Sequence, residues 1–154
     1  MKILFLSVGK PRQPEATALF EEYSSRIRRI GLEVDSRWVK EASGDGRFTD
    51  DQLMEREATA LKAALPHRSR IIALDRSGAM MDSRKLASRI EGWTTPRGVF
   101  VIGGPLGLHP SFLARAEQLW SLSPLTFPHD LARAVVSEQV YRALTLLRRI
   151  PYHK

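Results

Sequence analysis

The feature that most constrains this chain is a regular alternation of short strand-like runs with longer segments of helical periodicity. The strand-like runs are 2–8 (KILFLSV), 32–39, 70–75 and 98–103. Between the first two, apolar residues recur every three or four positions over 14–30, which ends at Gly31. Strands and helices that alternate in this way form a mostly parallel sheet with helices on both faces. We therefore predict an α/β fold with a mostly parallel central sheet, in a single domain over 1–154.

The remaining elements follow from capping residues and breakers. Thr49 begins a T-D-D-Q capping box and Pro66 follows the helical segment, while Asp82 can cap a helix that runs to about Gly92. Further helices are expected from Pro110 to about Leu119 and over about 130–147, with 121–127 as the last strand or extended segment. Residues 40–48 are expected to form a loop, and 76–81 a turn.

Composition narrows the class of protein. The chain has no cysteine, which excludes disulfides, thiol catalysis and cysteine-ligated metals. Its apolar runs are far shorter than the ~20 residues of a membrane span, and the first residues lack the pattern of a secretory signal. We expect a soluble, cytoplasmic protein with no membrane partner.

The charge balance points to a partner. Twenty-four Lys and Arg against 17 Asp and Glu give a net charge of +7, and arginine dominates the excess. Basicity of this kind indicates a polyanion, most simply nucleic acid. The alternative, that the charge only aids solubility, stays open on composition alone.

Residues 100–110 (FVIGGPLGLHP) carry a glycine cluster directly after a strand. They match neither the Walker loop nor the dinucleotide fingerprint, and Pro105 removes a backbone donor that a phosphate would need. Closely spaced glycines suit a backbone that approaches a flat ligand or another segment, although a tight turn without ligand is also compatible. Because ligands bind at the carboxyl ends of parallel strands, the stretches after Leu74, Ile102 and Leu122 are expected at one edge of the sheet.

The C-terminal helix has an apolar row that continues into Glu138 and Arg142, spaced by four. One interpretation is a surface ion pair worth ~0.2–0.5 kcal/mol. The other is a polar patch in a site, adjoining His129 at the helix start and the tail residues Tyr152 and His153. The histidines show no zinc-binding spacing and no G-x-S-x-G elbow is present, so neither a metal site nor a serine hydrolase is expected.

Five stretches together resemble a known family. They are LDRSGAMMDSRKLA at 74–87, FVIGGPLGL at 100–108, SLSPLTFPHDLAR at 121–133, EQVYRA at 138–143 and the terminal PYHK. In order and spacing the chain is similar, over nearly its whole length, to the RlmH family of SPOUT methyltransferases. The resemblance implies a SPOUT-type α/β fold with a C-terminal deep trefoil knot, and a homodimer. It also implies methylation of N3 of a pseudouridine in 23S rRNA, on the assembled ribosome, with S-adenosylmethionine as methyl donor and no metal.

The resemblance also implies site residues. The expected cofactor-binding residues are Leu74, Gly103, Gly104, Leu122, Ser123, Pro124, Leu125, Thr126 and Phe127. The expected catalytic residues are His129, Glu138, Arg142, Tyr152 and His153. Either histidine could handle the proton of N3, Arg142 could stabilise negative charge with Glu138 orienting it, and Tyr152 could stack on or hydrogen-bond the base.

Seven basic residues are expected to attract RNA: Arg26, Arg28, Arg29, Arg133, Arg148, Arg149 and Lys154. For the cluster at 26–29 a solvated helix face is an equal alternative. Two other functions remain open. One is a catalytically idle RNA- or ribosome-binding module that kept the fold. The other is a knotted methyltransferase acting on tRNA, for instance at a ribose 2′-hydroxyl, which the PYHK ending and the lack of an accessory domain disfavour.

Overall fold

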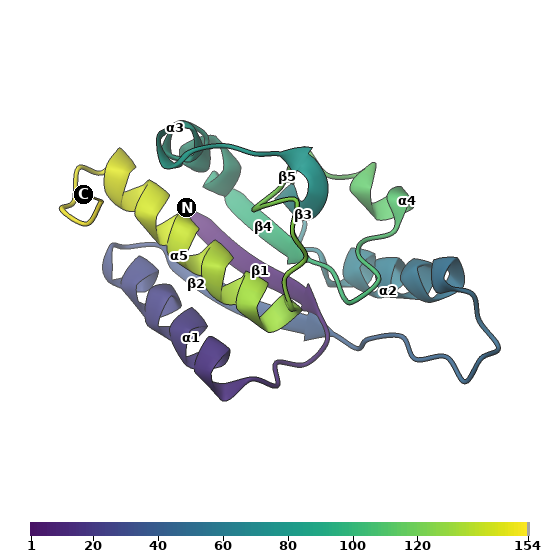
Figure 1. Ribbon diagram of the computed structural model, residues 1–154. Helices are drawn as coiled ribbons and strands as arrows, with labels where there is room; N and C mark the ends of the chain where they lie inside the picture. The colour runs from purple at the N-terminus through teal and green to yellow at the C-terminus, as the bar shows by residue number, and fades with distance from the viewer. Residues whose placement is uncertain (154) are drawn as a thin grey trace.

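The computed structural model describes residues 1–153, and the predicted alternation of strands and helices is present (Figure 1). In chain order the elements are β1 (Lys2–Val8), α1 (Pro14–Arg29), β2 (Glu33–Val39), α2 (Asp50–Ala64), β3 (Arg70–Ala79), α3 (Ser83–Thr94), β4 (Arg97–Ile102), α4 (Pro110–Leu113), β5 (Gln118–Trp120) and α5 (His129–Leu147). The capping box at Thr49 forms as predicted, and Asp82 caps α3 by accepting from the Lys85 N–H.

The five strands form one sheet in the order β2-β1-β4-β3-β5, and every pair is parallel. The predicted parallel sheet is therefore confirmed. All strands run in the same direction, so the segments that follow β1, β4 and the part of β3 that pairs with β4 (70–74) meet at one edge.

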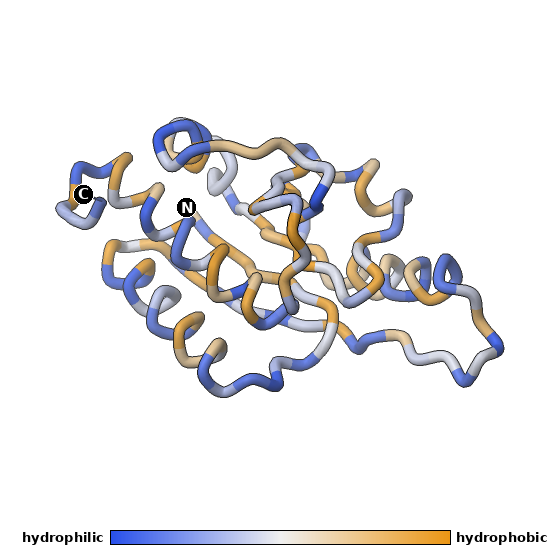
Figure 2. The backbone as a smooth tube through the Cα atoms, viewed as in Figure 1, coloured by the Kyte–Doolittle hydropathy of each residue, from blue (hydrophilic) through white to orange (hydrophobic). Residues whose placement is uncertain are grey.

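Side chains alternate between two cores, because successive residues of a strand point to opposite faces. One core contains Phe5, Phe20, Phe100 and Trp120 and lies on the face covered by α1, α3 and α5. The other contains Leu6, Val101 and residues of α2 and α4. In Figure 2 hydrophobic colour follows the strands in the middle of the molecule, while the helices alternate hydrophobic and hydrophilic stretches. Among residues 1–153 no helix is long and apolar enough to cross a membrane.

The prediction of a helix over 110–119 is wrong beyond its first turn. Helix α4 has four residues, and the chain then forms strand β5 at the edge of the sheet. The Glu117 N–H donates to the Ile71 carbonyl, and Trp120 packs against the rings of Phe100 and Trp93. Pairing with β3 and burial of the indole outweigh the weak helical propensity of this segment.

Two other boundaries differ from the prediction. Strand β3 continues through 76–79, where a turn was expected, and its Ala79 pairs with Trp120 after an irregularity in register. Residues 121–127 form no strand, because Pro124 and Pro128 cannot donate to a ladder and the serines of this segment bond locally. The loop over 40–48 is present as predicted.

Candidate active site

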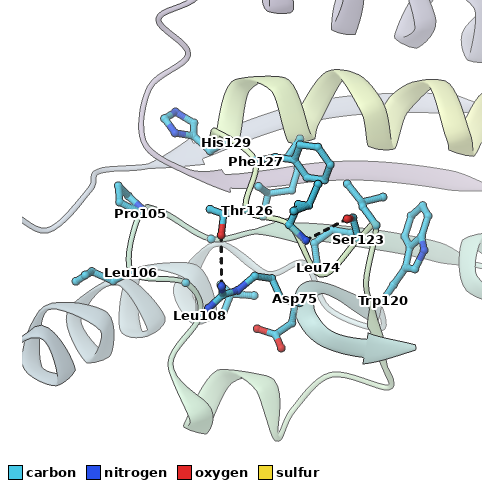
Figure 3. A pocket seen from close by; sticks show the side chains of 18 residues that line it. Leu74, Asp75, Pro105, Leu106, Leu108, Trp120, Ser123, Thr126, Phe127 and His129 are labelled. Atoms are coloured by element: carbon cyan, nitrogen blue, oxygen red, sulfur yellow. Dashed lines mark hydrogen bonds between the residues drawn. The ribbon is translucent and has the colours of Figure 1, made fainter. Parts of the chain in front are cut away.

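A pocket of about 230 Å³ opens at the carboxyl end of β4, where β3 stops pairing with β4 at Leu74, beside the segment before α5 (Figure 3). Its walls come from 74–76, 102–108 and 120–127, with two residues of α5. These are the three segments that the sheet topology predicted at one edge. Apolar side chains, including Leu74, Ile102, Trp120 and Leu122, form much of the lining, and charged side chains are few.

The glycine cluster shapes one wall of this pocket by close packing of the chain on itself. The Gly107 N–H donates to the Gly104 carbonyl at 2.9 Å, which closes a tight turn with Pro105 in its second position. A Cβ on Gly103 would lie 3.0 Å from the carbonyl carbon of Gly107 and 3.1 Å from Cγ of Leu108. The glycine at 103 therefore allows another segment to approach, and Pro105 is suited to the turn rather than harmful to it.

The segment over 121–127 forms the opposite wall through local hydrogen bonds. The Ser121 hydroxyl donates to the Ser123 carbonyl at 3.1 Å, and the Ser123 hydroxyl accepts from the Leu125 N–H at 3.0 Å. Eight of the nine expected cofactor-binding residues line the pocket, and Pro124 does not. Their role in binding remains a prediction. Sequence reasoning placed Asp75 at this edge without a role and did not single out Arg76 or Trp120, which also line the pocket.

His129 is the only expected catalytic residue among the pocket-lining residues, all of which lie within the described chain. A Cβ on Gly9, whose φ is +90°, would lie 3.3 Å from Nε2 of His129, so the ring lies over the end of β1. The same Nε2 lies 3.3 Å from Oδ1 of Asp130. Figure 3 shows His129 and Asp75 on opposite sides of the pocket.

Asp130 was missed by sequence reasoning. Its carboxylate is 4 % exposed, and Oδ2 accepts from the N–H groups of Arg12 and Gln13 at 2.8 Å each. Burial alone would raise the pKa of Asp130, but these two backbone hydrogen bonds outweigh it and lower the pKa below its usual value. Because Gln13 provides no side-chain cap of its own, Asp130 fixes the start of α1 against the start of α5.

The other four expected catalytic residues lie together, but at the far end of α5. Glu138 Oε1 accepts from Nε of Arg142 and from the Tyr152 hydroxyl, both at 3.0 Å, and His153 Nδ1 lies 3.4 Å from Nη1 of Arg142. Burial first, and then hydrogen bonds to Tyr23 and Glu138, raise the pKa of Tyr152, which keeps the phenol neutral as a donor. The network is half-buried, so it is more than a surface ion pair.

The expectation that all five groups lie in one place is wrong for a single chain. At 1.5 Å per residue, Glu138 is about 14 Å and Arg142 about 20 Å from His129 along the helix axis. In Figure 1 the chain leaves α5 at the end of the helix opposite to the one that the segment 121–128 joins. One helix thus carries one part of the candidate site at each end.

The basic residues expected to contact RNA divide into three groups. Arg133 is 4 % exposed, with its guanidinium 4.2 Å from the centre of the Phe20 ring, so the expectation of RNA contact is wrong for this residue. The others in the described chain are at least partly exposed: Arg26, which pairs with Glu22, and Arg28, Arg29, Arg148 and Arg149. A hydrogen bond from Arg148 to the Ile30 carbonyl joins the ends of α1 and α5, where most of them gather. Lys154 lies outside the described residues.

Comparison with known proteins places this geometry in a family. Residues 1–153 match the family model described as "Predicted SPOUT methyltransferase", and the chain belongs to the SPOUT methyltransferase family. Full-length relatives carry a more specific name. Proteins named "Ribosomal RNA large subunit methyltransferase H" are 36% identical over 156 residues in Ralstonia pickettii (strain 12J) and 39% identical over 158 residues in Alkalilimnicola ehrlichii. Each alignment covers 100% of this chain and 99% of the relative.

A solved structure supports the fold. "The structure of a probable methylase family protein from Haemophilus influenzae Rd KW20" superimposes with a TM-score of 0.54 at 13% identity, over 96% of this chain and 66% of that chain. The five-stranded parallel sheet with helices on both faces is thus the SPOUT family's α/β fold in this chain.

Proposed function

We propose that the chain methylates N3 of a pseudouridine in 23S rRNA, on the assembled ribosome, with S-adenosylmethionine as the methyl donor. The observation that carries this proposal is similarity over the full length to proteins named "Ribosomal RNA large subunit methyltransferase H". The pocket at the carboxyl edge of the sheet and the net charge of +7 agree with a nucleoside-containing donor and an RNA substrate.

The residues of the pocket fit this donor. The apolar walls suit a purine ring, and the turn over 104–107 together with the segment 122–127 offers backbone groups that can hydrogen-bond its edge. Leu74, Gly103 and the segment 122–127 would hold the donor, as the family resemblance implies. When bound, S-adenosylmethionine supplies an activated methyl group carried on a sulfonium.

The protein's own groups have to align the target nitrogen and remove its proton. His129, at the side of the pocket, is suited to accept the N3 proton, because one ring nitrogen of an imidazole can accept a proton. Arg142, oriented by Glu138, is suited to stabilise the charge that develops on the carbonyl oxygens of the base. Tyr152, a neutral donor, can hydrogen-bond or stack on the base, and His153 is the alternative proton acceptor.

These two groups of residues can act on one base only if a second subunit brings them together. We therefore include a homodimer in the proposal, in which the tail network of one protomer approaches the pocket of its partner. Leu131 and Leu147 on α5 are 39% and 37% exposed, and Leu125 beside the pocket is 71% exposed, which gives a dimer apolar surface to bury.

Subunit mixing tests this arrangement. His129→Ala and Tyr152→Phe variants, each weakly active alone, should regain activity when they are unfolded and refolded together, because every mixed dimer then contains one intact site. A mixture no more active than the sum of its parts would contradict a shared site.

The C-terminal trefoil knot is also part of the proposal. The loop over 103–108 and the segment over 121–127 line the same pocket, which agrees with a chain whose last part is threaded close to the glycine loop. Knots are rare exceptions among folds. The knot would be contradicted by an experimental structure in which the path of the backbone becomes a straight line when the two chain ends are drawn apart.

The activity itself is tested by transfer of labelled methyl from S-adenosylmethionine to three substrates: intact ribosomes, free large subunits and ribosomes that lack pseudouridine. We expect label in large-subunit RNA of intact ribosomes, and none where pseudouridine is absent. Label that persists without pseudouridine would refute the proposed base. Failure to bind the donor at all would favour the idle RNA-binding module instead.

A further inference from the structure

Arg76 reaches across the mouth of the pocket. It lies in β3 two residues after Leu74, is exposed to solvent and belongs to the pocket lining. Its Nη1 donates to the hydroxyl of Thr126 at 3.4 Å, and the dashed line to Thr126 in Figure 3 marks this hydrogen bond. The side chain therefore joins the wall formed by β3 to the wall formed by 122–127.

This contact leaves most of the guanidinium available. An arginine has five N–H donors, and the single bond to Thr126 is long for a hydrogen bond. Among residues 1–153 five other arginines form ion pairs with carboxylates, whereas Arg76 forms none. Its neighbour Asp75 instead accepts from the N–H and hydroxyl of Ser77. Arg76 thus presents a positive charge without an ion-pair partner at the pocket mouth, next to Asp75, whose carboxylate also belongs to the lining.

One charge of the pocket is complementary to a charge of the methyl donor. Among the lining residues, all of them in the described part of the chain, Arg76 is the only one with a permanent positive charge. S-adenosylmethionine carries one negatively charged group, the α-carboxylate of its methionine part. A guanidinium presents donors in a fork that matches the two oxygens of a carboxylate.

We propose that Arg76 binds the α-carboxylate of the methyl donor at the mouth of the pocket and so discriminates in favour of ligands that keep the amino-acid part. This inference rests on the proposed function, because it presumes that the pocket takes S-adenosylmethionine. The nucleoside part of the ligand then lies against the apolar walls, and Thr126 holds the guanidinium across the opening before the ligand arrives.

Two small ligands separate this role from a general effect on the pocket. S-adenosylhomocysteine keeps the α-carboxylate, whereas 5′-methylthioadenosine has the same thioether-linked nucleoside without the amino-acid part. Binding of both is measured by titration calorimetry with the unaltered protein, Arg76→Gln and Arg76→Lys. Arg84→Gln is the matched control, because Arg84 is exposed on α3, lies outside the pocket and loses the same charge.

We expect Arg76→Gln to weaken S-adenosylhomocysteine binding about 10- to 100-fold, the range for loss of a hydrogen bond to a charged group, and to leave methylthioadenosine binding unchanged. Arg76→Lys should retain part of the affinity and Arg84→Gln all of it. Equal loss for both ligands, or no loss for either, would overturn the inference.

A third outcome assigns the residue to RNA. If Arg76→Gln leaves both small ligands unaffected but weakens ribosome binding with a reduced salt dependence, the guanidinium contacts a phosphate and the inference is refuted. Should the unaltered protein bind neither small ligand, the proposed function fails and the inference fails with it. Binding of S-adenosylhomocysteine that is indifferent to Arg76 overturns the inference alone.

Discussion

Asp130 offers the sharpest test of how the candidate site is held together. Its buried carboxylate accepts two backbone hydrogen bonds, from Arg12 and Gln13, at 2.8 Å each. Replacing it by alanine leaves two partly buried donors without a partner, at about 1–3 kcal/mol each. Allowing for water entry, we expect Asp130→Ala to lower the free energy of unfolding by about 2–4 kcal/mol. For a domain of this size that corresponds to roughly 5–15 °C in Tm.

Asp130→Asn separates charge from shape, and its effect depends on pH. The folded state lowers the pKa of Asp130, so the unfolded state binds the proton more tightly. The stabilisation by the carboxylate is therefore present above the unfolded pKa of about 3.9 and is lost as the pH falls through the lower folded pKa. The stability difference between the unaltered protein and Asp130→Asn should accordingly be constant near neutral pH and shrink below about pH 4.

Thermal and urea unfolding at several pH values measure both effects. The control is Asp50→Asn. Asp50 is exposed at the start of α2, and its replacement by asparagine removes the same charge. A surface change of this kind should cost about 1 kcal/mol or less. If Asp130→Ala is no more destabilising than the control, or if the pH dependence of the asparagine variant equals that of the unaltered protein, the reasoning is refuted.

Three further predictions concern the pocket wall, the core and a buried acid. Gly103→Ala should weaken S-adenosylhomocysteine binding in a titration, because its Cβ would displace the loop, whereas Gly92→Ala, with open space around it, should not. Phe112→Ala should cost about 3–5 kcal/mol in urea unfolding, against less than about 0.5 kcal/mol for the exposed Met80→Ala. Burial raises the pKa of Glu57, so the folded state binds the proton of this carboxyl group more tightly than the unfolded state does. The stability of the protein therefore falls as the pH rises above about 4.3, the unfolded pKa. Glu57→Gln should accordingly raise Tm at pH 8 and leave it unchanged near pH 4.

The sheet and the pocket could be predicted because their signals are local. Apolar runs such as FVIG mark buried parallel strands, and parallel strands bring their carboxyl ends to one edge wherever they lie in the sequence. Strand β5 could not be predicted in this way. Residues 117–120 have a composition that helices tolerate. They form a strand only because they pair with β3, whose Ile72 lies opposite Gln118 and precedes it by 46 residues in the sequence.

Contacts between distant residues explain the other omissions. Asp130 bonds to Arg12 and Gln13 across 118 and 117 positions, and no periodicity reports such a contact. Arg133 was expected on the surface because arginine usually lies there. Its guanidinium instead lies over Phe20 and donates to the Ser36 hydroxyl, both of which belong to other elements.

The division of the candidate catalytic residues, by contrast, was already contained in the predicted helix over about 130–147. Residues that are nine positions apart on a helix are separated by about 14 Å along its axis, whatever surrounds them. A single helix therefore cannot bring His129 and Glu138 to one base, because the helix keeps the distance between these two residues fixed. A second copy related by a two-fold axis could place the end of one helix beside the start of the other, because such an interface brings each patch to the partner's complementary patch. The rigid helix would then set the distance between the two sites of the dimer, and the hydrogen bonds of Glu138 with Arg142 and Tyr152 would hold each tail ready for the opposite pocket.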